Sequence, residues 1–261
     1  MRILTASRII LAATLTSIIL FSCKTEKEDF VTDKATEYFL ALQPGKYITY
    51  RLDSMVFVHF NKDREIHRYQ VKEQVDAQVT DALGRPAYRI FRYMRDSAGT
   101  QPWNPVGTFL VTVLENKIEL IEDNLRFIKL HMPITEGFSW KGNTYIADDP
   151  YLPLGFNFSN DNSDVFPFWD YFYDGGLGSF SYNGKNYTNV LTVEEVDEST
   201  NVPIVSPSSY ASRSRAVERY SKDIGMVFKH YELWEYQPDP AGGTNYNYFG
   251  FGVTMWMIDH N

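Results

Sequence analysis

The sequence predicts a mostly β protein: a single antiparallel meander that forms a curved sheet or half-open barrel. Two observations support this prediction. Short runs in which apolar and polar residues alternate follow one another along the chain, and turn-forming residues separate them, as expected for antiparallel strands with one buried face. Sustained helical periodicity is missing, as are a fixed-period repeat and a linker that would divide two domains.

The individual elements follow from these patterns. A short helix is expected over Asp33–Leu42, and Pro44-Gly45 is expected to end it. The segment Val202–Ser214 is rich in Ser and Pro and poor in apolar residues, so we expect a surface loop there. The predicted strands are Lys46–His59, Tyr69–Asp81, Ala87–Arg95, Thr108–Leu114, Lys117–Glu122, Arg126–Leu130, Tyr187–Val196, Ala216–Tyr220, Met226–Tyr236 and Phe249–Ile258.

Charge and cysteine content exclude several functional classes. The 261 residues include 33 Asp and Glu against 25 Lys and Arg, which gives a formal net charge of −8. We therefore expect no nucleic-acid partner, because the chain lacks a basic stripe that could displace phosphate counterions. The single cysteine rules out a disulfide framework and a cysteine-rich metal site.

The N-terminus has the pattern of a secretory signal over residues 1–22. Arg2 and Arg8 supply its positive charge, and Ile9–Phe21 is an uncharged run too short to span a bilayer comfortably. The run ends in Leu20-Phe21-Ser22-Cys23, which resembles the lipobox of bacterial lipoproteins. That resemblance implies that Cys23 becomes the lipidated first residue of the mature chain, with the outer membrane as its partner, and that no thiol is left for catalysis. Each buried acyl CH₂ group contributes ~0.8 kcal/mol of membrane affinity, and more than one acyl chain would anchor the protein stably.

Residues 23–36 are expected to form an acidic tether before a single β-rich domain over residues 37–261. The segment Lys24-Thr25-Glu26-Lys27-Glu28-Asp29 is similar to the acidic tracts that direct some Bacteroidota lipoproteins to the cell surface. Charged residues also make an ordinary solvated tether. Of the two faces of the outer membrane that these readings leave open, we favour the cell surface over the periplasmic face.

Four segments resemble a family of uncharacterised Bacteroidota outer-membrane lipoproteins. The opening YFLALQPGKY at 38–47 is similar to the family's "YFPL..G.Y" signature, and RFIKL at 126–130 with GFSWKGN at 137–143 resembles its middle. RYSKDIGMVFK at 219–229 resembles its "YAKGIGLVYK" element, and the chain ends in IDHN like the family. Leu40-Ala41 and Asp223 depart from the pattern, where the family tends to carry proline-leucine and glycine. The resemblance implies location and fold, with no activity to carry over.

Motifs for catalysis and metal binding are missing from the sequence. There is no Gly-x-Ser-x-Gly, no His-Glu-x-x-His and no phosphate-binding glycine loop. Carboxylates pair at Asp148-Asp149, Glu194-Glu195 and Glu119/Glu122, but a glycosidase needs two acids ~5–9 Å apart in one cleft, which spacing alone does not show. We therefore expect no catalytic residue, no metal site, no cofactor and no enzymatic activity.

The segment Tyr145–Tyr187 is the most unusual part of the chain, because thirteen aromatic residues lie among Gly, Asp and Asn. Aromatic faces beside polar groups suit a sugar ring, and the same residues could line a cavity for an acyl chain. An insertion that packs its own aromatics on the sheet is the remaining possibility. Trp169, Tyr171 and Tyr173 would share one face of an extended strand, so they are the predicted ligand contacts.

Three functional hypotheses remain. The first is a non-enzymatic lipid-anchored envelope protein that binds a small amphipathic ligand in the barrel, or an envelope partner. The second is a surface glycan-binding lipoprotein that uses the aromatic segment 145–187 as an exposed platform. The third is a hydrolase whose acids converge from distant strands.

Overall fold

The computed structural model describes residues 33–158 and 166–261, and residues 33–261 form one compact unit. The strands are β1 (Tyr47–Val58), β2 (Asp63–Thr80), β3 (Pro86–Asp96), β4 (Asn104–Val113), β5 (Lys117–Glu122), β6 (Leu125–His131), β7 (Ser139–Lys141), β8 (Asp170–Tyr173), β9 (Gly178–Tyr182), β10 (Lys185–Thr200), β11 (Ala211–Ser221), β12 (Gly225–Gln237) and β13 (Asn247–His260). The short 3₁₀ helices are η1 (Ala35–Glu37), η2 (Leu152–Leu154) and η3 (Phe166–Phe168). None of the helices in the described ranges is long and apolar enough to cross a membrane.

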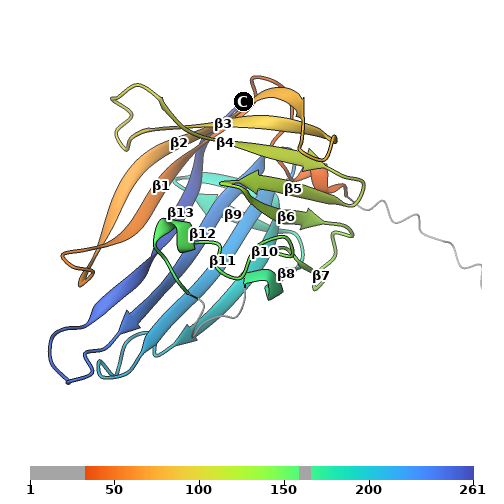
Figure 1. Cartoon of the computed structure of the whole chain (residues 1–261). Helices are drawn as coiled ribbons and strands as arrows, with labels where there is room; N and C mark the ends of the chain where they lie inside the picture. Colours follow the sequence, from red (N-terminus) through yellow and green to blue (C-terminus); the bar gives the residue numbers. More distant parts are fainter. Residues whose placement is uncertain (1–32, 159–165) are drawn as a thin grey trace, which may run out of the picture. The chain divides into compact units, whose positions relative to one another are not determined.

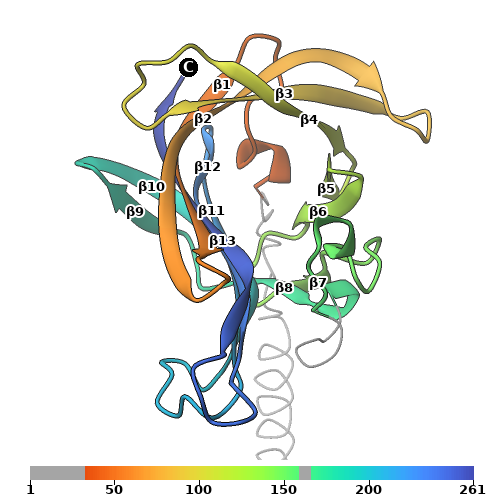
Figure 2. The same cartoon turned by 60° about the vertical axis from the view of Figure 1, so that its left-hand side comes forward.

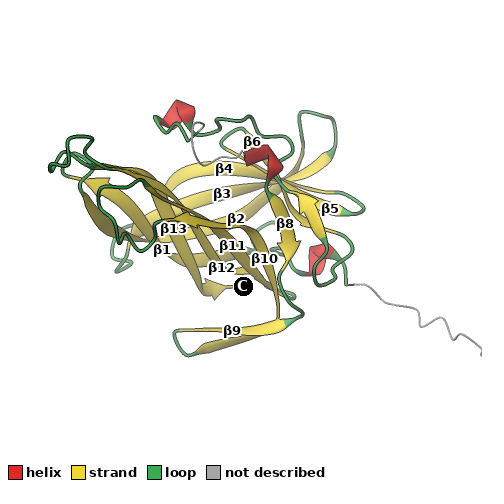
Figure 3. Cartoon of the chain, turned by 90° about the horizontal axis from the view of Figure 1, so that it is seen from below, coloured by secondary structure: helices red, strands yellow, loops and turns green. Residues whose placement is uncertain are grey.

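The strands form one antiparallel meander that curves into a nearly closed barrel (Figure 1). The order across the sheet is β6-β5-β4-β3-β2-β1-β13-β12-β11-β10-β8-β7, and β9 lies off this path, paired with β10 (Figure 3). The last strand therefore pairs with the first. The prediction of a mostly β chain with one curved, half-open antiparallel meander is confirmed.

The seam of the barrel lies between the edge strands β6 and β7, and a few specific contacts cross it. The backbone N–H of Ile128 donates to the carbonyl of Gly142 at 2.8 Å. The indole N–H of Trp140 donates to the carbonyl of Ile128, also at 2.8 Å. These bonds satisfy part of two sheet edges that would otherwise expose unpaired backbone groups.

The N-terminal segment of the described unit packs into the core of the barrel. Figure 2 shows η1 within the curve of the first strands. Tyr38 is fully buried, and its hydroxyl donates to Asp33 at 2.6 Å. Asp33 also pairs with Lys222 at 2.7 Å. The folded unit thus already includes Asp33, inside the range predicted as tether, and the helix expected over Asp33–Leu42 is a single turn.

The remaining differences from the predicted elements lie at the starts of two strands and in the region between β6 and β11. β2 begins at Asp63 instead of Tyr69, and β4 begins at Asn104 instead of Thr108. The strands β7 and β9 are missing from the predicted elements because each is short, whereas β8 covers the stretch in which Tyr171 and Tyr173 would share one face if extended. The loop expected over Val202–Ser214 is shorter, since β11 begins at Ala211 and pairs with β12 along its length. The short strands and the early start of β11 depend on pairing with neighbouring strands, which the local amino-acid composition does not indicate.

Candidate binding cavity

A cavity of about 280 Å³ lies inside the barrel, with an adjoining inner recess of about 50 Å³. Apolar and aromatic side chains form much of its wall: Leu52, Leu120, Leu125, Phe127, Tyr151, Leu154, Tyr231, Phe251, Val253 and Met255. Charged side chains from seven strands line the deeper part and the recess. A volume of this size exceeds what single buried waters require and approaches that of small-molecule sites.

Two β-bulges bring a buried ion pair into this cavity. In the β5–β6 ladder, Ile118 pairs with Leu130 and Glu119 pairs with Ile128, so Lys129 is the extra residue of β6. In the β10–β11 ladder, Glu195 is skipped in the same way between Glu194 and Val196. A bulge re-aims a side chain at a defined position. Lys129 and Glu195 thereby meet in the interior, 2.5 Å apart.

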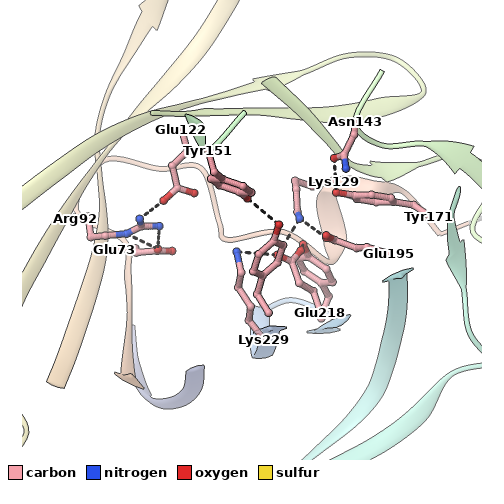
Figure 4. A network of polar contacts seen from close by, with 12 residues as sticks. Glu73, Arg92, Glu122, Lys129, Asn143, Tyr151, Tyr171, Glu195, Glu218 and Lys229 are labelled. Atoms are coloured by element: carbon pink, nitrogen blue, oxygen red, sulfur yellow. Dashed lines mark hydrogen bonds and ion pairs between the residues drawn. The ribbon is translucent and has the colours of Figure 1, made fainter. Parts of the chain in front are cut away.

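The bulge residues belong to a network that joins opposite walls of the barrel (Figure 4). Lys129 Nζ also lies 2.9 Å from a carboxylate oxygen of Glu218 in β11. Glu218 in turn accepts from the Tyr220 hydroxyl and lies 3.3 Å from Nζ of Lys229. The side chains of Lys129, Glu195 and Glu218 are at most 6% exposed, so these charges depend on one another and not on water for compensation.

A second group of charges lies on the neighbouring wall. Arg92 of β3 donates to Glu73, its cross-strand neighbour in β2, at 2.7 Å. The other side of the same guanidinium donates to Glu122 at the end of β5. One cation thus holds two carboxylates, an arrangement that suits the forked geometry of arginine.

Burial and pairing move the pKa values of these acids in opposite directions. Burial raises the pKa of Glu195, because removal from water disfavours the charged carboxylate more than Lys129 favours it. Burial also opposes ionisation of Glu218, but the ammonium groups of Lys129 and Lys229 outweigh it and lower the pKa. The same balance lowers the pKa of Glu122, where Arg92 is the main stabilising charge.

The described aromatic residues between β7 and β8 pack on β12 and β13 next to the cavity. The Tyr151 hydroxyl lies 2.8 Å from that of Tyr231 in β12. Phe156 packs against Phe249 and Phe251 of β13, with ring centroids 5.3 and 5.2 Å apart. These contacts agree with an insertion that packs its aromatic side chains on the sheet. Tyr151 and Leu154 of the same insertion also line the cavity.

The three predicted contact residues occupy two different environments. Tyr171 and Tyr173 share one face of β8, as predicted, but that face is the core, and they are 0% and 1% exposed. Trp169 precedes β8, is half-buried and packs on Phe166 at 4.9 Å between ring centroids. Tyr171 and Tyr173 therefore offer no ring face to a sugar, whereas Tyr145 and Phe168 of the same segment are 54% and 65% exposed.

Tyr171 and Tyr173 instead support the seam and the cavity floor. The Tyr173 hydroxyl donates to the carbonyl of His131 at 2.6 Å and accepts from the His131 N–H at 3.1 Å. The Tyr171 hydroxyl donates to Asn143 at 2.7 Å, and its ring lies 5.5 Å from Lys129 Nζ. The partners of these two tyrosines, His131 and Asn143, cannot be identified from the sequence pattern.

Neither Glu194-Glu195 nor Glu119/Glu122 brings its two carboxylates together in one site. Glu194 pairs with Arg215 at 2.8 Å, whereas Glu195 points into the cavity. Glu119 binds Arg85, Lys117 and Arg126, whereas Glu122 reaches Arg92. The acids that converge are Glu195 and Glu218 on adjacent strands, which sequence reasoning missed. A signal existed: Lys129 is a lone charge between Phe127-Ile128 and Leu130.

Two further predictions concern the lipid anchor and the absence of a metal site. Cys23 and the signal lie outside the described residues, as does the acidic tract after Cys23. Within residues 33–158 and 166–261, no group of three or more His, Cys, Asp or Glu side chains could hold a metal ion.

Two solved structures are similar to this chain. No family model and no curated protein matches the sequence. A crystal structure of a candidate lipoprotein from Parabacteroides distasonis is similar, with 13% identity and a TM-score of 0.36 over 88% of this chain and 100% of that one. A second is a candidate exported protein with a YmcC-like fold from Bacteroides fragilis, with 10% identity and a TM-score of 0.29 over 86% and 99% of the two chains. Likeness at this level assigns no function.

Proposed function

We propose that this chain is a non-enzymatic, lipid-anchored envelope protein that binds a small amphipathic molecule inside its barrel. The observation behind the proposal is the cavity of about 280 Å³, which is apolar near Leu154 and Phe251 and charged near Lys129 and Glu195. A ligand with an apolar body and a polar head matches such a gradient. Cys23 supplies the anchor in this proposal, and the outer membrane is its location.

Hydrolysis of a glycoside is the second candidate, and the acid pair in the cavity favours it. Glu195 and Glu218 bond the same ammonium group, so their carboxylates lie close together, and their pKa values are moved apart. That combination is typical of an acid and a nucleophile. However, Lys129 Nζ stands between the two carboxylates, in the place where a glycosidic oxygen or water would have to lie. We therefore rank binding above hydrolysis.

Native mass spectrometry tests the binding proposal. The chain from Lys24 onward, purified from a bacterial envelope, is expected to carry an added mass of lipid size. A neutral dye, N-phenylnaphthylamine, is expected to bind the delipidated protein and to fluoresce there. A bare protein mass together with an unchanged dye spectrum would overturn the proposal.

A pair of variants locates the binding. Val253→Phe adds bulk in the cavity wall, whereas Val106→Phe adds the same bulk to an exposed position of β4. We expect dye binding to be lost in the first variant and kept in the second. For hydrolysis, release of nitrophenol from nitrophenyl glycosides that is lost in Glu218→Gln would promote the second candidate.

Fractionation tests the anchor. The full chain is expected in the membrane fraction, and Cys23→Ala is expected in the soluble envelope fraction, because the acyl chains supply the membrane affinity. Protease added to intact cells then distinguishes surface display from the periplasmic face. A Cys23→Ala variant that stays with the membrane would contradict the lipid anchor.

A further inference from the structure

We infer that the cavity selects amphiphiles with a cationic head, such as an amine or a quaternary ammonium group. This inference rests on the proposed binding function and names the ligand class. Its first basis is the charge inventory of the described residues that line the cavity and its recess. Arg92, Lys129 and Lys229 face five carboxylates: Glu73, Glu122, Asp123, Glu195 and Glu218. A cation entering this site reduces the excess of negative charge, and an anion increases it.

The second basis is that the cations already have carboxylate partners. Arg92 bonds both Glu73 and Glu122, and Lys129 bonds both Glu195 and Glu218. An anionic head that took over either cation would leave a buried carboxylate without its partner, which is costly in a dry interior. Lys229 has the weakest pairing, at 3.3 Å from Glu218, and it shares that carboxylate with Lys129. An ammonium head displaces none of these contacts.

The third basis is the aromatic wall beside the acids. Phe127, Tyr151, Tyr231 and Phe251 all line the cavity. Lys129 Nζ lies 5.6 Å from the ring centroid of Phe127 and 5.5 Å from that of Tyr171, so ring faces already accept an ammonium group in this interior. Cation–π contacts of this kind are the common means of recognising quaternary ammonium ligands.

Entry to the cavity has the same chemistry. Asp123 lies in the exposed turn between β5 and β6 and lines the cavity. Leu154 of η2 also lines the cavity and is 68% exposed. A cationic amphiphile would meet a carboxylate and an apolar side chain together at this rim. Burial also raises the pKa of Glu195 further inside, which agrees with a carboxyl that is short of positive charge.

Displacement of N-phenylnaphthylamine by three amphiphiles of equal chain length tests the inference. Decyltrimethylammonium, decyl sulfate and decanol share the same alkyl chain and carry a cationic, an anionic and a neutral head. We expect the cation to bind at least about tenfold more tightly than the sulfate, which is a difference of roughly 1.4 kcal/mol, with decanol between them. Failure of all three to displace the dye would contradict the proposed function itself. Equal displacement by all three would overturn the charge preference and leave the binding function intact.

Variants assign the preference to the cavity acids. Glu195→Gln and Asp123→Asn each remove one negative charge from the cavity, and the second lies in an exposed turn where the fold tolerates it. Glu115→Gln removes an acid from the exposed turn between β4 and β5, outside the cavity, and serves as the control. We expect both cavity variants to weaken binding of the cation severalfold relative to binding of decanol, and Glu115→Gln to leave the binding of both amphiphiles unchanged. Tighter binding of the sulfate than of the cation, lost in Lys229→Gln, would reverse the inference.

Discussion

Lys129 and Glu195 are each the unpaired residue of a β-bulge, and their side chains meet 2.5 Å apart in the interior. Lys129 lies on the edge strand β6, while Glu195 lies on β10, near the other end of the meander. The ion pair therefore links the two sides of the seam, where the ladder of backbone hydrogen bonds is interrupted. The same two bulges give the cavity its charged floor.

Removing Lys129 is expected to be strongly destabilising. Lys129→Met leaves Glu195 without its cation in a buried site, so we expect a loss of about 3–5 kcal/mol in the free energy of unfolding. The double variant Lys129→Met/Glu195→Gln should recover part of that loss, as measured by urea denaturation. Lys141→Met, which breaks an exposed pair with Asp170, should cost at most about 1 kcal/mol. If the stability losses of Lys129→Met alone and Glu195→Gln alone added up to the loss in the double variant, the two residues would not be coupled.

The seam is expected to weaken when the Tyr173 hydroxyl is removed. Tyr173→Phe leaves both the N–H and the carbonyl of His131 without this partner, and each unsatisfied buried group costs about 1–3 kcal/mol. Hydrogen exchange of the Ile128 amide, which bonds Gly142 across the seam, should become faster. Tyr47→Phe removes an exposed hydroxyl bonded to Asp259 and should leave that exchange rate unchanged. An unaltered Ile128 rate in Tyr173→Phe would mean that the hydroxyl does not hold the seam.

Gly250 in β13 is expected to tolerate no side chain. Its φ is +123°, and an added Cβ would lie 2.2 Å from the carbonyl oxygen of Leu233 in β12. We expect Gly250→Ala to lose about 3 kcal/mol or more, since backbone strain and a backbone clash add. Gly242→Ala, with φ +72° and open space around it, should lose about 1–2 kcal/mol. Thermal unfolding followed by circular dichroism compares them, and similar midpoints for the two variants would contradict the clash.

Acid is expected to destabilise the connection between β2 and β3 through Asp81, which is buried. Its carboxylate accepts from the Arg85 side chain at 2.8 Å and from the backbone N–H groups of Leu83 and Arg85 at 2.9 Å. These bonds, led by that from the Arg85 side chain, lower the pKa of Asp81 from 3.8 to about 2. The unfolded chain therefore takes up this proton first as the pH falls.

The stabilisation from Asp81 should be complete above its unfolded pKa and lost as the pH falls toward about 2. Asp81→Asn should lower stability at neutral pH and should flatten the pH dependence between these two values. Urea midpoints measured at a series of pH values give both quantities. Parallel curves for the variant and the unsubstituted protein would assign the acid sensitivity to other carboxylates.

The alternation of residues determined most of the fold. β5 matches its predicted range of Lys117–Glu122, and β1 and β3 match their predicted ranges to within one residue at both ends. Such strands are recognisable because one buried face imposes a period of two on the sequence. β7, β8 and β9 have three to five residues each, which is too short for that period to stand out from an aromatic-rich background.

The tertiary structure alone decided the candidate site. The sequence by itself indicated that Tyr171 and Tyr173 share a face, but whether that face meets solvent or the core depends on which strands close over it. Likewise, a strand pattern assigns Lys129 and Glu195 to a face only if the register is regular, and a bulge is defined by the partner strand. These two residues are 66 positions apart in the chain. Their meeting, and the cavity they line, arises from pairing between distant strands, which local sequence does not encode.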